Sequence, residues 1–310
     1  MRDPAELYEV VGDLEAVPRG LELVATMTGF ADAGGTVAQL NEYVLDTLDH
    51  EELVRFDNDE LLDYRSRRPI MTFEQTRLTE YRPAGLALYR VEDEIGRPFL
   101  LLAGYEPDMK WERFSAAVLG LAERLGVAHF SWVHAIPMPV PHTRPIGVTV
   151  SGNREDLIES LSIWRPTTTI PSTAMHLIEY RLQERGFPAA GFVLLVPHYL
   201  GDTVYPPAAV AALEAITAAT GLLFPTDELR EAGREFLGRV EEQVEANGEL
   251  ARLIEGLERR HDSYVEDNPM RSPLTDREGS LPTADEIAEE LQKFLAIRRP
   301  GEDETGPDES

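Results

Sequence analysis

Residues 21–48 read LELVATMTGFADAGGTVAQLNEYVLDTL, and this stretch decides the fold. Leu21 to Thr28 is an apolar run with the length of a buried strand. Beyond the glycines at positions 34 and 35, apolar residues recur at the spacing of one helix face, namely Val37, Leu40, Val44, Leu45 and Leu48. A strand, a glycine-rich loop and a helix in direct succession predict one unit of an α/β protein.

The same alternation continues through the first two-thirds of the chain. Further strands are expected at 99–103, 127–133, 146–150 and 192–196. Further helices are expected at 114–125, at 207–221, and between a cap at Ser172 and a stop at Gly186. Repeated alternation predicts a three-layer α/β/α core, whose mixed and mostly parallel sheet is covered on both faces.

Two stretches depart from this rhythm. Between 53 and 104 the chain reads as strands and irregular segments, and two apolar runs at 86–91 and 99–102 flank a polar turn, which predicts a hairpin. A hairpin projecting from the core would form a natural contact between copies. From 229 to 257 the pattern is that of amphipathic helix, with a turn at Asn247-Gly248.

We therefore expect three parts. Residues 1–226 form the α/β core, with the hairpin or irregular insertion at about 53–104. Residues 227–299 form a helical segment that could act as a lid and that includes a linker at 267–283. Residues 300–310 form an acidic, disordered tail.

Composition excludes several classes of function. The chain has 310 residues, 56 acidic and 29 basic, with a formal net charge of −27, so nucleic acid and membrane surfaces are not expected partners. The absence of cysteine excludes disulfides, thiolate nucleophiles and cysteine-ligated metals, and no cofactor is predicted. No apolar run has the roughly 20 residues that span a bilayer. Met1 to Glu9 is not a basic, apolar leader, so a cytoplasmic location is expected.

Four loops follow predicted strands directly, at 28–35, 104–108, 134–145 and 197–202. Ligands of open α/β sheets bind beyond the carboxyl ends of strands, so these loops converge on one site if their strands are parallel neighbours. They supply the candidate ligand-binding residues, which are Gly29, Asp32, Gly34, Gly35, Glu106, His134, His142, Arg144, His198 and Tyr199.

Each candidate also has a purely structural interpretation. The glycine-rich loop could hold an anion at a helix start or simply make a tight turn, and Asp32 could bind a ligand or cap that helix. Glu106 is the better candidate for a general base or ligand. His134, His142 and Arg144 lie in a proline-rich loop that is either a titratable site or a stiff connector. No metal-binding spacing or complete catalytic motif is present, so no metal is predicted and enzymatic activity is left open.

Several segments together resemble the proteasome-assembly-chaperone superfamily, in its branch of unknown function from high-GC Gram-positive bacteria. They are Gly29-Phe-Ala-Asp-Ala-Gly34, 63–69 (DYRSRRP), Gly104-Tyr-Glu-Pro-Asp108 with Trp111, 141–145 (PHTRP), and Pro197-His-Tyr199 with Tyr205-Pro206. The resemblance implies a core like that of nucleoside phosphorylases and some hydrolases. It also implies an oligomerising hairpin and a C-terminal helical segment.

Two functions follow as expectations. The first is an oligomeric protein-interaction or ligand-binding protein, a homo-oligomer with a trimer favoured over a dimer. Some relatives bind proteasome subunits through a C-terminal hydrophobic-Tyr-any pattern, whereas this chain ends Gly306-Pro-Asp-Glu-Ser310, which argues against that docking mode. The alternative is a small-molecule hydrolase or phosphorylase-like enzyme with its site at the strand ends under a helical lid.

Overall fold

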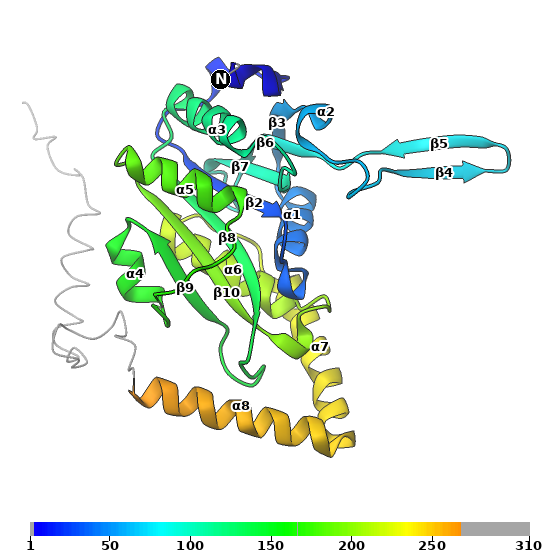
Figure 1. Cartoon of the computed structure of the whole chain (residues 1–310), viewed down its shortest axis with the longest axis vertical. Coiled ribbons are helices and arrows are strands. Elements are labelled where there is room, and N and C mark those ends of the chain that lie inside the picture. Colours follow the sequence, from blue (N-terminus) through cyan, green and yellow to red (C-terminus); the bar gives the residue numbers. More distant parts are fainter. Residues whose placement is uncertain (1–2, 166, 268–310) are drawn as a thin grey trace, which may run out of the picture. The chain divides into compact units, whose positions relative to one another are not determined.

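The computed structural model describes residues 3–165 and 167–267 (Figure 1). The described residues form one compact unit. Most of the expected linker and all of the acidic tail lie outside the described residues. None of the described helices is long and apolar enough to cross a membrane.

The strands of the described chain form one eight-stranded sheet and one two-stranded sheet. The large sheet has the order β1-β3-β6-β7-β2-β8-β10-β9, and the small sheet consists of β4 and β5. The strand bounds are β1 Tyr8–Val10, β2 Glu22–Thr28, β3 His50–Phe56, β4 Ile70–Glu74, β5 Arg77–Arg82, β6 Leu86–Glu92, β7 Pro98–Tyr105, β8 His129–Met138, β9 Gly147–Gly152 and β10 Ala189–Pro197.

Four adjacent strands of the large sheet are parallel. β7 pairs with β2, β2 with β8, and β8 with β10, all in parallel register. The remaining pairs, β1 with β3, β3 with β6, β6 with β7 and β10 with β9, are antiparallel. The sheet is therefore mixed, with a parallel centre, and the predicted α/β fold is confirmed.

Helices cover both faces of the parallel centre. Their bounds are α1 Thr36–Thr47, α2 Asn58–Leu61, α3 Trp111–Leu125, α4 Glu155–Leu161, α5 Ala174–Glu184, α6 Pro206–Thr220, α7 Asp227–Ala246 and α8 Gly248–Asp267. Alternate residues of β2 divide between two buried cores, because Leu23 packs with α3 and α5 while Val24 packs with α1 and α6. This division gives the three layers.

The ends of the helices agree with the sequence signals except at α5. Gly126 and Gly221 follow α3 and α6 as expected. Thr173, and not Ser172, caps α5: its hydroxyl accepts from the His176 N–H, and the His176 ring accepts from the Thr173 N–H. A histidine thus fills the place that glutamate or glutamine usually takes in a capping box.

The expected hairpin at 86–102 is confirmed as β6 and β7, which lie inside the large sheet. A second hairpin, β4 and β5, forms its own two-stranded sheet and extends away from the rest of the fold (Figure 1). No residue of β4 or β5 is buried. The projecting hairpin is thus at 70–82.

Candidate functional site

The four candidate loops lie at one edge of the sheet. β7, β2, β8 and β10 are neighbours and parallel, so their carboxyl ends point the same way. The loops that follow them are therefore close together. Because side chains alternate between the faces of a sheet, the candidate residues nevertheless divide into separate groups.

Glu106, after β7, joins two other segments. Its carboxylate is buried and accepts hydrogen bonds from the N–H of Ala174 at 2.6 Å and of Phe30 at 3.4 Å. A Cβ on Gly29 would overlap the Glu106 Oε2 atom, so glycine leaves room for this carboxylate. Glu106 therefore places negative charge at the start of α5, which the helix dipole favours.

His134 lies beside Glu106, on the face of β8 that carries Trp132. Burial lowers the pKa of His134 to about 4, and the nearby His176 adds to this effect, so the imidazole is neutral at neutral pH. A cavity of about 10 Å³ is lined by Gly29, Glu106 and His134 together with Met27, Trp132, Val133, Thr173 and Met175. That volume corresponds to about one water molecule, so no substrate fits in this arrangement.

Asp32 and the two glycines build the start of α1. The Asp32 carboxylate accepts from the N–H groups of Val37 at 2.7 Å and Ala38 at 3.0 Å, and burial raises its pKa. Gly34 has a φ of 73°, and its N–H and C=O bond to Gly201 and Tyr205. The Asp32 carboxylate and the Gly34 backbone groups are therefore hydrogen-bonded within the chain, and Asp32 caps the start of α1.

His142 and Tyr199 form a second group, on the loops after β8 and β10. The Tyr199 hydroxyl accepts from the His142 N–H at 2.8 Å and lies 2.7 Å from the His142 Nδ1. Burial lowers the pKa of His142, while Glu241 of α7 and Glu258 of α8 act in the opposite direction. His198 is exposed and contacts the ring of Tyr199 at 5.4 Å between centroids.

Arg144 fastens this loop to α8. Its guanidinium binds both carboxylate oxygens of Asp262, at 2.8 and 2.7 Å, and lies 3.4 Å from Glu258. The hydrogen bonds from Arg144 lower the pKa of Asp262 to about 2. Tyr264 of α8 also donates to the carbonyl of Ile163. Arg144 is thus committed to a carboxylate of the chain itself.

The candidates consequently do not form one pocket within the described chain. Gly29, Glu106 and His134 line one cavity, whereas His142, Arg144 and Tyr199 contact the α8 side. Asp32, Gly34 and Gly35 belong to the α1 start. No group of three or more histidine or acidic side chains that could hold a metal occurs among the described residues.

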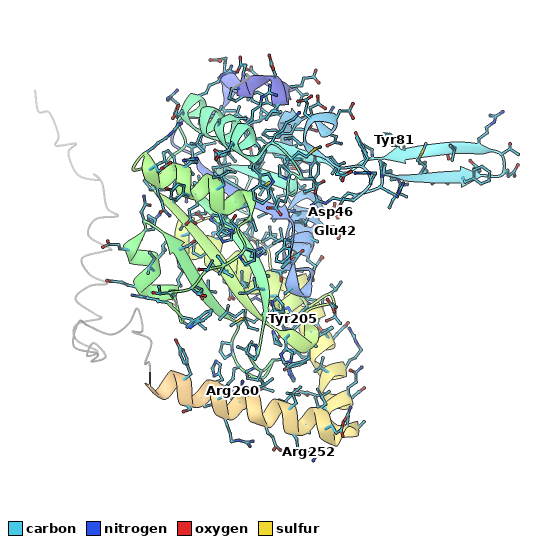
Figure 2. All side chains as sticks on the ribbon, in the orientation of Figure 1. Glu42, Asp46, Tyr81, Tyr205, Arg252 and Arg260 are labelled. Carbon is cyan, nitrogen blue, oxygen red and sulfur yellow. The ribbon has the colours of Figure 1, made fainter. Side chains whose placement is uncertain are left out.

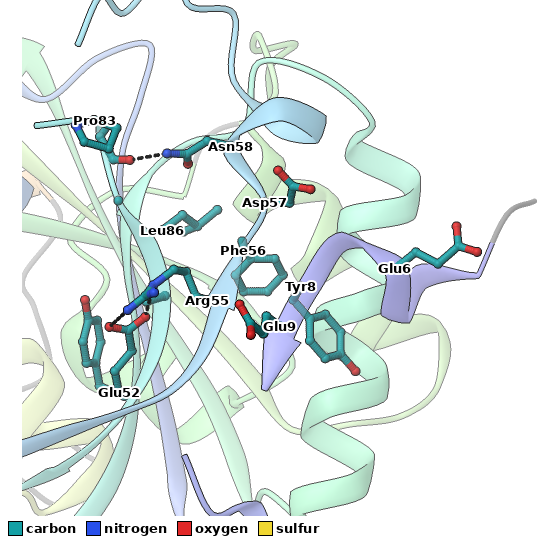
Figure 3. Close-up of a pocket in the computed structure, with 14 residues that line it drawn as sticks. Glu6, Tyr8, Glu9, Glu52, Arg55, Phe56, Asp57, Asn58, Pro83 and Leu86 are labelled. Atoms are coloured by element: carbon teal, nitrogen blue, oxygen red, sulfur yellow. Dashed lines mark hydrogen bonds and ion pairs between the residues drawn. The ribbon is translucent and has the colours of Figure 1, made fainter. Parts of the chain in front are cut away.

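A pocket of about 500 Å³ lies elsewhere, on the antiparallel side of the sheet (Figure 3). Its walls come from β1, β3, β6 and the connection between β5 and β6. They are formed by Glu6, Tyr8, Glu9, Glu52, Arg55, Phe56, Asp57, Asn58, Pro83, Ala84, Gly85, Leu86, Ala87 and Tyr89. No pocket is predicted here from the sequence, because its walls combine residues 6–9, 52–58 and 83–89, which no local pattern connects.

A family model described as the PAC2 family matches residues 26–244. A Mycobacterium tuberculosis protein described as an unknown function protein, Rv2714, is 42% identical over 84% of this chain and 90% of its own, with a TM-score of 0.78. A Corynebacterium glutamicum protein, described as of unknown function, is 35% identical over 84% and 99%, with a TM-score of 0.79.

A more distant structure shares the fold. A Mycobacterium tuberculosis proteasome-assembly chaperone homologue, Rv2125, is 22% identical over 76% of this chain and 100% of its own, with a TM-score of 0.68. No protein with a curated description is significantly similar to the chain.

Proposed function

The chain belongs to the PAC2 family, and on that premise we propose that it acts in the cytoplasm as a homo-oligomer whose β4–β5 hairpin makes the contact between copies. One observation carries the proposal. The hairpin exposes five large apolar side chains, with exposed fractions of 70% for Ile70, 45% for Met71, 70% for Phe73, 63% for Leu78 and 55% for Tyr81. Several exposed large apolar side chains on one element are typical of protein contacts.

The hairpin also lacks a core of its own. Every residue of β4 is exposed, and in β5 only Thr79 is partly covered. An isolated two-stranded hairpin is marginally stable in water, so a partner that covers it stabilises it. In Figure 2, Tyr81 lies on this hairpin, well separated from Tyr205 in the body. A second copy of the chain is the simplest partner, because it is present wherever the protein is and at the same concentration.

The mass of the protein in solution tests this proposal. The wild type is expected to show a multiple of 34.7 kDa by light scattering at micromolar concentration. The double variant F73D/L78D is expected to run as a monomer, because two charges then replace the central apolar pair of the hairpin. I95D is the matched control, since Ile95 is 71% exposed but lies in the β6–β7 turn. A monomeric wild type, or an F73D/L78D variant with the wild-type mass, would contradict the proposal.

A proteasome subunit is a second partner to test, because a relative of the fold is described as a proteasome-assembly chaperone homologue. Co-purification with 20S α-subunits, with F73D/L78D as the comparison, tests whether the same hairpin takes part. Binding that F73D/L78D abolishes supports this partner, and no binding at micromolar concentration rules it out.

A further inference from the structure

We infer that the hairpin tip of one copy docks into the pocket of about 500 Å³ on the next copy, with Arg77 of the tip facing Glu9 of the pocket. This inference rests on the proposed function and adds the surface that receives the hairpin. The contact is then heterologous, since two different surfaces meet.

The tip combines an apolar pair with a free cation. Phe73 and Leu78 are direct partners across the two strands, and both are exposed. Arg77 follows the turn and lies opposite Glu74 across the strands; its side chain is exposed and forms no hydrogen bond or ion pair with any residue in the described part of the chain. The other arginine of the hairpin, Arg82, is already paired with Glu80 at 2.7 Å. Arg77 is therefore the charge that a partner surface can satisfy.

The pocket offers the complementary features. Phe56, Leu86 and Ala87 are buried there, and the half-buried Tyr8 and Tyr89 add aromatic surface (Figure 3). Because Phe56, Leu86 and Ala87 are covered by the chain itself, the partly exposed rings of Tyr8 and Tyr89 are the apolar surface that can contact the Phe73–Leu78 pair.

Three of the four acidic side chains around the pocket are already engaged. Glu52 binds Arg55 through both carboxylate oxygens, at 2.7 and 2.9 Å. Asp57 caps α2, and Glu6 binds Arg113 at 2.6 Å.

Glu9 lies opposite Arg55 across β1 and β3, and its charge is one of the causes that raise the pKa of Arg55. The Glu9 side chain is exposed and has no hydrogen bond or ion pair within described residues 3–165 and 167–267. Glu9 therefore matches the free Arg77.

The distribution of charge favours the same pairing. Residues 65–82 contain five arginines, at positions 65, 67, 68, 77 and 82, against Glu74 and Glu80, in a chain with a net charge of −27. Three of these arginines lie in the approach at 65–68, whereas the hairpin at 70–82 has two arginines and two glutamates; the rest of the chain is strongly acidic. The positive charge of the approach therefore favours an encounter with the acidic surface of another copy.

The geometry has a consequence for symmetry. Because the pocket includes Pro83, Ala84 and Gly85, it lies at the base of the hairpin that the same copy donates. Each copy therefore gives a hairpin and receives one, and such heterologous contacts close into a ring when the rotation allows it. A ring of three satisfies this pattern and agrees with the expected trimer.

Charge reversal tests the pairing with full-length protein. R77E and E9R are each expected to weaken association at least tenfold, measured by sedimentation velocity across a dilution series. The double variant R77E/E9R is expected to recover the wild-type oligomer, since it restores opposite charges at every contact. E159R, on the exposed face of α4, is the matched control and is expected to leave association unchanged.

The outcomes separate this inference from the proposed function. If F73D/L78D dissociates the oligomer while E9R does not, the hairpin is the contact but the pocket is not its receptor, and the inference fails alone. If E9R dissociates the oligomer and the double variant R77E/E9R does not restore it, the pocket matters but the Arg77–Glu9 pairing is wrong. If the wild type is a monomer, the proposed function fails as well.

Discussion

At residue scale, Glu106 shows why the candidate loops lie together without forming a substrate pocket. Its N–H donates to the carbonyl of Thr28, and its carboxylate binds the N–H groups of Phe30 and Ala174. The Arg67 side chain donates to its carbonyl at 2.5 Å. One residue therefore ties together the segments after β2, after β7 and before α5, and its charge serves the fold.

Gly29 is expected to be needed for this arrangement. In G29A the new Cβ displaces the Glu106 carboxylate, which leaves buried N–H groups without their acceptor. We expect the free energy of unfolding to fall by about 1–3 kcal/mol, measured by urea denaturation. G238A is the control, since a Cβ there meets no neighbour. A G29A variant as stable as the wild type would contradict this role of Glu106.

The lowered pKa of His134 makes the free energy of unfolding depend on pH. Its folded pKa of about 4 is lower than the ordinary histidine pKa of 6.5, so the unfolded state binds a proton more readily between these pH values. The stability contributed by the neutral imidazole is therefore complete above pH 6.5 and is lost as pH falls toward 4. Between pH 7.5 and 5, His134 accounts for a loss of about 2 kcal/mol.

The variant H134Q is expected to lose correspondingly less stability over that range, as measured by urea denaturation at the two pH values. H198Q, at an exposed position, should keep the wild-type dependence. Equal losses in H134Q and the wild type would show that His134 does not titrate in this way.

At the scale of elements, α8 is held to the body by polar contacts more than by apolar burial. Among its described side chains, only Ile254 and Leu257 are buried. Arg144 binds Asp262, Thr143 binds Glu258, and the Asn247 side chain caps the helix start. Elements with few buried apolar contacts open at low free-energy cost. We therefore propose that α8 opens more easily than the helices that pack on the sheet.

Removal of the Arg144–Asp262 pair is expected to increase this opening. In D262N we expect amide hydrogen exchange in α8 to become several-fold faster, while exchange in α3 stays unchanged. R144D/D262R should recover part of the protection, because the reversed charges can pair again. R259A is the control, since Arg259 only approaches Glu255 at 3.9 Å. Exchange in α8 that is equally slow in D262N and the wild type would refute the role of this pair.

The sequence predicts the central elements well and the hairpin poorly, for physical reasons. Residues 21–48 show a continuous apolar run followed by a helical period, because β2 is buried on both faces of the sheet and α1 is buried on one side. β4 and β5 are exposed on both faces, so burial imposes no alternation on them. The register shift between Ile70 and Thr72, and the positive φ of Glu80, break the period further.

The candidate site could be predicted only in part. Loop convergence follows from strand order, which the alternation of strands and helices implies. The partners of each side chain do not follow from it, because they are distant in sequence: Glu106 meets Ala174, and Arg144 meets Asp262. The pocket at β1, β3 and β6 combines residues 6–9 with 52–58 and 83–89, which no local pattern connects.

At the scale of the whole described unit, the two halves of the sheet differ. The parallel half has helices on both faces and a carboxyl edge whose polar groups are bonded within the chain. The antiparallel half carries the projecting hairpin and the pocket. The exposed apolar hairpin and the pocket are thus both on the antiparallel half, which is why we assign the function to contacts between copies.

Cross-linking between copies tests this claim most directly, because the chain has no cysteine of its own. The variant T76C/V10C places one thiol at the hairpin tip and one on β1 beside Glu9, and leaves both Arg77 and Glu9 in place. With a short bismaleimide, we predict covalent multimers for T76C/V10C at micromolar concentration and none for T76C or V10C alone. A T76C/V10C protein that stays at 34.7 kDa on a denaturing gel would contradict the account.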